Sequence, residues 1–257
     1  MPLRYFGGSV SRVLTAGAGS VAIMGVAENM TAVRARIDQT CRRVGRDPGE
    51  VRLMPVSKTF QPELIKEAYA AGARIFGENR VQEAVQKATA LADVPDLAWA
   101  IIGHLQSNKV KQAVEVASEF QALDSIKIAE ALDRRLQQAG RSLDVLVQVN
   151  SSDEPQKYGL PPDKIEDFAL QLKPFSSIRV RGLMTLAVLS DDQAAVAACF
   201  MRMRTLQQRL LDLDQAPGSY DELSMGMSGD FELAIEYGAT TVRVGQAIFG
   251  PRPPMHH

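Results

Sequence analysis

The first residue whose position suggests chemistry is Lys58, which directly follows the apolar run 51-VRLMPVS-57. A run of this length is typical of a buried strand, so the lysine would stand where the strand leaves the core. When desolvation or a neighbouring cation supplies the neutral amine, such a lysine forms a Schiff base with a carbonyl group. The alternative is that Lys58 is only the first solvated residue of a loop.

Two glycine-containing turns near the end of the chain, in 224-SMGMSGD-230 and 242-VRVGQAIFG-250, suit a phosphate group. Ser228 is expected to cap the short helix that follows it, and Gly229 allows close approach to the backbone. A helix N-terminus presents unpaired N–H groups that bind phosphate. Gly245 would let backbone amides close the other side of the site. The alternative is that these glycines only serve tight turns.

The elements that must position these residues alternate regularly along the chain. Apolar runs of strand length occupy 51–57, 73–78, 97–103, 119–124, 143–150, 178–186, 221–227 and 240–249. Helical patterns occupy 27–45, 62–72, 80–91, 107–117, 126–140, 163–172, 191–213 and 229–238. Eight strands that alternate with helices predict a single (β/α)8 TIM barrel of the α/β class, and near-continuous apolar strands fit a parallel sheet buried on both faces. An open doubly wound sheet is the alternative, but its glycine-rich turn is missing after the first strand.

Barrel proteins build their sites from the loops at the C-terminal ends of the strands. The residues at these ends include Lys58, Asn79, Met184, Ser228, Gly245 and Gln246. Because a barrel closes, strands seven and eight lie beside strand one, and the phosphate-binding turns would come within reach of the lysine. A lysine beside a phosphate site indicates pyridoxal 5′-phosphate (PLP) or, alternatively, the sugar-phosphate substrate of a Schiff-base aldolase.

The composition of the 257-residue chain is that of an ordinary globular protein, with 46% apolar and 23% charged residues. Lys and Arg number 29 against 30 Asp and Glu, and no block of like charges occurs, so nucleic acid is not expected as a partner. Cys41 and Cys199 lack a CxxC partner, which predicts a reducing, cytoplasmic setting without a disulfide or zinc site. No apolar run reaches the length of about 18 residues that crosses a membrane.

The N-terminal segment differs from the rest of the chain, because residues 7–25 are rich in small side chains, weakly charged and without clear periodicity. We interpret residues 1–23 as a disordered extension and residues 24–257 as the barrel domain. A transit peptide is the alternative, which Arg4 and Arg12 support weakly.

Six segments, taken in order, resemble the pyridoxal phosphate homeostasis proteins, single-domain relatives of the alanine racemase N-terminal barrel. They are 56-VSKT-59, 76-FGENRVQE-83, 102-IGHLQSNK-109, 148-QVNSSDEPQKYG-159, 181-RGLM-184 and 224-SMGMSGDFELAIEYGATTVRVGQAIFG-250. The resemblance covers about residues 27 to 250 and implies a fold type III PLP barrel without the C-terminal β domain. The family usually has a histidine where this chain has Ala100, so the resemblance implies no role for that side chain.

The cofactor-binding set that the resemblance implies is Lys58, Asn79, Met184, Ser224, Ser228, Arg243, Gly245 and Gln246. In this set Lys58 would carry PLP as a Schiff base, Ser228 and the turn after the last strand would contact the phosphate, and Arg243 would face the pyridine nitrogen. The resemblance implies no catalytic residue and no metal ligand.

The function that follows is intracellular PLP homeostasis, in which a monomer holds, buffers or delivers the cofactor to PLP-dependent apoenzymes without robust turnover. A pyridine nitrogen that faces arginine stays unprotonated, which makes PLP a poor electron sink. Only 251-PRPPMHH-257 follows the last strand, so the second domain of racemases is not expected. The alternative is a PLP-dependent amino-acid racemase that uses Tyr158 or Lys157 as its base, and a Schiff-base aldolase is a weaker one.

Overall fold

The computed structural model describes residues 25–213 and 215–251. Its strands form one parallel eight-stranded sheet in the order β1-β8-β7-β6-β5-β4-β3-β2. They are β1 (Arg52–Pro55), β2 (Ile75–Glu78), β3 (Ala98–Ile101), β4 (Glu119–Leu123), β5 (Leu143–Val149), β6 (Ile178–Thr185), β7 (Glu222–Ser224) and β8 (Thr241–Val244). The two outer strands of this order meet at a bridge between Val56 and Gly77, where the N–H of Ser57 donates to the carbonyl of Gly77 at 3.1 Å. The sheet therefore closes into the predicted (β/α)8 barrel.

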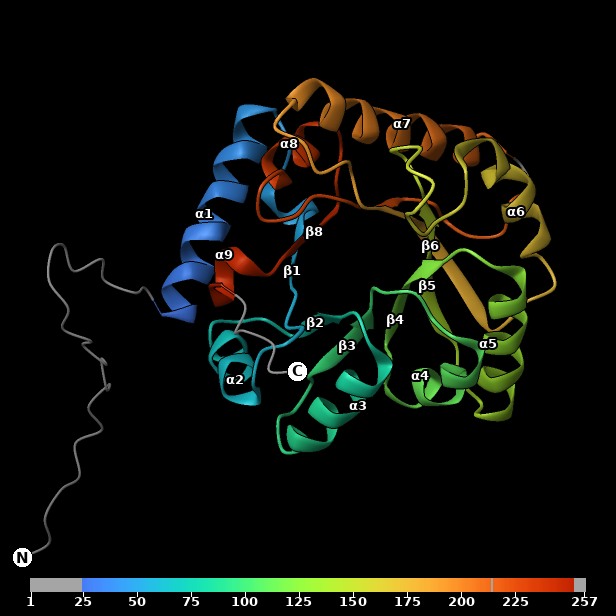
Figure 1. Ribbon diagram of the computed structural model, residues 1–257, viewed down its shortest axis with the longest axis horizontal. Coiled ribbons are helices and arrows are strands. Elements are labelled where there is room, and N and C mark those ends of the chain that lie inside the picture. The colour runs from blue at the N-terminus through green and yellow to red at the C-terminus, as the bar shows by residue number, and fades with distance from the viewer. Residues whose placement is uncertain (1–24, 214, 252–257) are drawn as a thin grey trace, which may run out of the picture.

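The helices surround the strands as a ring (Figure 1). They are α1 (Val26–Arg43), α2 (Pro62–Ala70), α3 (Val81–Ala90), α4 (Val110–Val116), α5 (Ile126–Gln138), α6 (Ile165–Gln171), α7 (Gln193–Leu211), α8 (Phe231–Glu236) and α9 (Gln246–Phe249). Short 3-10 turns, η1 (Pro48–Glu50), η2 (Ser107–Lys109) and η3 (Pro162–Lys164), precede β1, α4 and α6. The apolar stripe of α1, with Met30, Val33 and Ile37, is buried against the barrel, because its spacing of three to four residues keeps it on one helix face.

The predicted eighth strand, residues 240–249, was wrong over its last five residues, 245–249. The strand ends at Val244, and α9 follows at once. The N–H groups of Ile248 and Phe249 both donate to the carbonyl of Gly245 at 2.9 Å, which turns the chain out of the sheet. Apolar periodicity cannot separate a short buried helix from the end of a buried strand, so the run AIF was assigned to the sheet.

Close backbone approach explains one glycine in the sheet. A Cβ atom on Gly182 of β6 would lie 1.9 Å from the carbonyl oxygen of Glu222 in β7. Only glycine permits this spacing between the two strands.

Among the described residues, no helix combines the length and apolarity needed to cross a membrane. The same part of the chain holds no cluster of three or more His, Cys, Asp or Glu side chains that suits a metal ion. The predicted extension, residues 1–23, lies outside the described residues.

Candidate functional site

A cavity of about 1260 Å³ opens at the carboxyl ends of the strands. Six residues of the predicted set line it: Lys58, Asn79, Ser228, Arg243, Gly245 and Gln246. The other two, Met184 and Ser224, are fully buried and do not belong to its lining. The loops after β1 and β2 and the loops after β7 and β8 thus contribute to one site, although more than half of the sequence separates the first pair from the second.

Lys58 stands where β1 leaves the barrel. The strand runs beside β8, with Pro55 in register with Val244, and the N–H of Val56 continues the ladder by donating to the carbonyl of Val244 at 2.9 Å. Lys58 is half-buried and lines the cavity that Gly245 also lines. The predicted proximity of the lysine to the turn after the last strand is therefore a result of barrel closure.

Ser228 connects the two glycine turns, but not in the way that the sequence suggested. Its hydroxyl oxygen accepts a hydrogen bond from the N–H of Ala247 in α9 at 3.3 Å. The predicted cap of the following helix was wrong, because Asp230 occupies the N-cap position of α8. The carboxylate of Asp230 instead accepts from the N–H of Met227 at 2.5 Å, which folds the loop back and directs Ser228 towards α9.

The glycines of these turns leave room for a ligand. A Cβ atom on Gly229 would meet nothing within 4 Å, although Gly229 lines the cavity. A Cβ atom on Gly245 would lie 3.2 Å from the carbonyl oxygen of Val56, so a larger residue would crowd the end of β1 next to Lys58.

Arg243 is buried in β8 and reaches the cavity wall. Its guanidinium donates to the hydroxyl oxygen of Ser224 at 2.7 Å and to the carbonyl of Thr185 at 2.6 Å. Burial lowers the pKa of Arg243 to about 10, and the charge of Asp230 opposes this effect. The guanidinium still carries its charge at neutral pH and acts only as a donor.

A chain of polar side chains continues from Arg243 through the barrel interior, and the sequence reasoning missed it. Ser224 donates to the amide oxygen of Gln121 at 2.7 Å, and Gln121 in turn donates to Glu119. Glu119 holds Arg52 through two hydrogen bonds of 2.9 Å. Glu119 and Gln121 occur two residues apart in the apolar strand β4, which places them on one face; this spacing was the signal for an interior polar chain.

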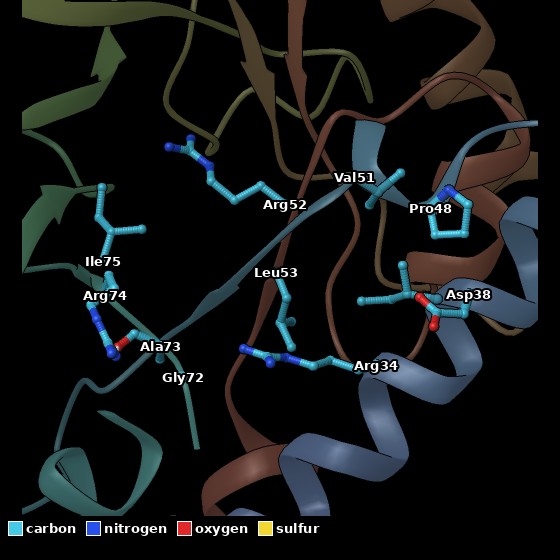
Figure 2. A pocket seen from close by; sticks show the side chains of 11 residues that line it. Arg34, Asp38, Pro48, Val51, Arg52, Leu53, Gly72, Ala73, Arg74 and Ile75 are labelled. Carbon is cyan, nitrogen blue, oxygen red and sulfur yellow. Dashed lines mark hydrogen bonds between the residues drawn. The ribbon is translucent and has the colours of Figure 1, made fainter. Parts of the chain in front are cut away.

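A second cleft, of about 410 Å³, lies at the opposite end of the barrel beside the start of β1 and β2. Figure 2 shows the side chain of Arg34 extending from α1 towards Gly72, whereas the side chain of Arg52 extends away from Arg34. Arg52 is bound by Glu119 and Glu222. None of the predicted site residues lies in this cleft, so the carboxyl-end cavity is the candidate functional site.

Three further residues near the ends of β2 and β3, Glu78, His104 and Ala100, are in contact with other parts of the protein. Glu78, at the end of β2, forms a buried ion pair with Lys87 at 2.7 Å. Burial raises the pKa of Glu78, and the charge of Lys87 opposes the rise. His104 stacks on Tyr158 with ring centroids 4.4 Å apart, and both line the cavity. Ala100 is buried in β3.

Comparison of sequences assigns this barrel to a family. The sequence profile described as "Alanine racemase, N-terminal domain" matches residues 29–253. A protein of Pseudomonas aeruginosa named Pyridoxal phosphate homeostasis protein is 43% identical over 227 residues, which cover 88% of this chain and 96% of that protein. The Mus musculus protein of the same name is 38% identical over 247 residues, which cover 92% of this chain and 90% of that protein.

Solved structures agree with this assignment. PipY of Synechococcus elongatus, determined with PLP bound, superposes with a TM-score of 0.78 at 41% identity and covers 88% of this chain and 100% of that chain. Alanine racemase of Streptomyces coelicolor is 20% identical with a TM-score of 0.66, and 86% of this chain matches 58% of the enzyme; it shares the fold. The chain described above therefore belongs to the pyridoxal phosphate homeostasis proteins, within the alanine racemase N-terminal domain family.

Proposed function

We propose that this protein binds PLP in the carboxyl-end cavity and serves intracellular PLP homeostasis by holding, buffering or delivering the cofactor. The observation that carries the proposal is the meeting of Lys58, Arg243 and the Ser228–Gly245 turns on one cavity. The relatives named for PLP homeostasis and the PLP-bound structure of PipY support the same ligand.

The donor set of the cavity fits PLP. The hydroxyl of Ser228 and the first-turn backbone of α9, which already face each other at 3.3 Å, suit the phosphate, and the open space at Gly229 leaves room for its oxygen atoms. Arg243, which donates and cannot accept, suits the lone pair of the pyridine nitrogen. Lys58 supplies the amine. PLP itself supplies an aldehyde that condenses reversibly with amines.

In this arrangement each residue has a defined task. Lys58 holds the cofactor through its amine, and Ser228 with Gly245 and Gln246 retains the phosphate. Arg243 would donate to the ring nitrogen and leave it unprotonated, and PLP held in this way would be a weak electron sink, suited to storage more than to carbanion chemistry. Asn79 lines the cavity wall near the lysine. Ser224 does not line the cavity and acts only by accepting a hydrogen bond from Arg243. Met184 packs in the core behind the cavity.

A racemase remains the second candidate function, because Tyr158 and Lys157 line the cavity. Two contacts argue against their use as bases. Lys157 pairs with Glu154 and donates to the carbonyl of Ala187 at 3.0 Å, and Tyr158 is stacked on His104. Exchange of the α-hydrogen of amino acids for deuterium, followed in D2O by NMR, is expected to stay near the rate of free PLP; exchange at enzyme-like rates would support the racemase.

Delivery of the cofactor to apoenzymes is supported by apolar side chains at the cavity. Tyr158, Leu186 and Leu189 line it and are 60%, 39% and 96% exposed. Exposed apolar side chains beside a ligand site are suited to contact with another protein.

The monomeric state stays a prediction, which light scattering of the purified protein checks.

The central experiment tests Lys58. Reduction of the PLP-loaded protein with borohydride is expected to fix the cofactor on Lys58, which peptide mass spectrometry identifies, and the visible absorption band is expected to disappear in Lys58→Ala. Lys109→Ala is the matched control, because Lys109 lines the same cavity and should leave the band in place. An unchanged band in Lys58→Ala, or label on another lysine, would refute the assignment.

A further inference from the structure

Both chain neighbours of Lys58 are fixed by one cluster of charged side chains, formed by Glu78, Glu83 and Lys87. The hydroxyl of Ser57 donates to Glu78 at 2.6 Å, and the backbone N–H of Thr59 donates to Glu83 at 2.5 Å. The lysine is thus held from the residue before it and from the residue after it, while its own side chain lines the cavity.

Lys87 joins the two halves of this cluster. Its ammonium group donates at 2.7 Å to the carbonyl of Ser57, to Glu78 and to Glu83. An ammonium group has three N–H donors, so all three are engaged. Glu78 is fully buried and Lys87 nearly so. Loss of one partner from such a group would leave a buried charge without compensation.

The cluster also maintains an unfavourable backbone conformation. Thr59 has a φ of 70°, a left-handed conformation that is unfavourable for a residue with a Cβ atom, and a branched Cβ makes this region still less common. Such strain persists only where the surroundings determine it, and it gathers at functional sites. Here the bond from Thr59 to Glu83 stabilises the strained turn directly behind Lys58.

The sequence explains how the cluster forms. Glu78 ends β2, which pairs with the end of β1 through Val56 and Gly77. Glu83 and Lys87 are four residues apart in α3, so they lie on one helix face. Closure of the barrel between β1 and β2 therefore brings the helix face onto the backbone at residues 57–59.

We propose that Glu78, Glu83 and Lys87 are positioning residues, which fix the backbone at residues 57–59 so that the amine of Lys58 is presented to PLP. This inference rests on the proposed function, since it concerns the same cavity. The cluster touches no ligand in this scheme and acts only through Lys58.

The test compares Glu83→Leu with Glu83→Gln, each in the wild-type and in the Lys58→Ala background, by equilibrium dialysis of PLP. Glu83 is the most exposed member of the cluster, so its replacement perturbs folding least. Leucine removes the acceptor for Thr59, whereas glutamine keeps an oxygen there. We expect Glu83→Leu to weaken PLP binding about tenfold and Glu83→Gln about threefold or less. In the Lys58→Ala background both losses should shrink to about twofold or less.

The outcomes separate positioning from a general effect on the fold. An equal loss in both backgrounds would mean that Glu83 supports the whole cavity, and this overturns the proposal, as does wild-type affinity in Glu83→Leu. A wild-type protein that binds no PLP overturns the proposed function itself. Thermal unfolding of each variant checks folding. If Glu83→Leu does not fold, Glu83→Ala tests the same step, because alanine also removes the acceptor for the N–H of Thr59 without adding a large apolar side chain, and it should lower affinity only when Lys58 is present.

Discussion

At the scale of the single residue, the hydroxyl group of Tyr220 is buried and has no hydrogen-bond partner among the described residues. An unsatisfied buried hydroxyl is destabilising, because the unfolded chain hydrates it. Tyr220→Phe is therefore expected to raise the free energy of unfolding by about 1 kcal/mol at neutral pH. Urea unfolding followed by the fluorescence of the single tryptophan, Trp99, measures the change. Tyr158→Phe, at an exposed position, should change little.

The same residue predicts a pH dependence. Burial raises the pKa of Tyr220 above its ordinary value of 10.0, so above this pH the unfolded chain releases a proton that the folded protein keeps. The free energy of unfolding is therefore unaffected by this ionisation below about pH 10 and falls as the pH rises further. Tyr220→Phe should lose less stability than the wild type between about pH 9 and about pH 11. Identical losses in urea unfolding at the two pH values would contradict this account.

Ser228 gives a residue-scale prediction for the cavity. Ser228→Ala removes a hydroxyl that would contact the phosphate but leaves Lys58 untouched, so PLP affinity should fall about tenfold while the visible absorption band of the bound form keeps its position. Dialysis and absorption spectra of the same samples check both parts. A shifted band with unchanged affinity would place Ser228 near the ring instead of the phosphate.

At the scale of the element, the spacing of β6 and β7 depends on Gly182, whose Cβ atom would lie 1.9 Å from the carbonyl oxygen of Glu222. The contact is with backbone, which cannot rotate away, so Gly182→Ala must separate the two strands. We expect a loss of at least about 2 kcal/mol in the free energy of unfolding, measured by urea unfolding. Gly25→Ala is the control, because a Cβ atom there meets nothing within 4 Å; a similar loss in both variants would contradict the argument.

At the scale of the whole molecule, a polar chain runs through the barrel interior from Arg52 to Arg243. Gln121 is its central link, between Glu119 and Ser224. Gln121→Met keeps the volume but leaves both neighbours without their partner, so the free energy of unfolding should fall by about 1–3 kcal/mol. Gln208→Met, on the exposed face of α7, should stay within about 0.5 kcal/mol of the wild type. Equal stability of the two variants would mean that the chain is not needed for folding.

The sequence determined the elements and the types of residue at their ends. The spacing of apolar residues reflects the local geometry of a strand or a helix. Near-continuous apolar runs predicted all eight strands, and stripes that repeat every three to four residues predicted the helices between them. The two patterns are clearly different over segments of these lengths. It failed for α9, where four residues are too few to show a period. The motifs around Lys58 and Ser228 pointed to the family, which sequence and structural comparisons confirmed.

Only the tertiary structure decided which side chains meet. Ser228 contacts α9 instead of capping α8, because the direction of a loop depends on the contacts of Asp230 and not on residue type. Ser224 was expected in the cavity but lies behind it as a support for Arg243. In the sequence, Glu83 and Lys87 have the pattern of ordinary helix residues. Only the closure of β1 on β2 brings them into contact with the backbone on either side of Lys58. Contacts between residues distant in sequence depend on packing in three dimensions, which no local pattern encodes.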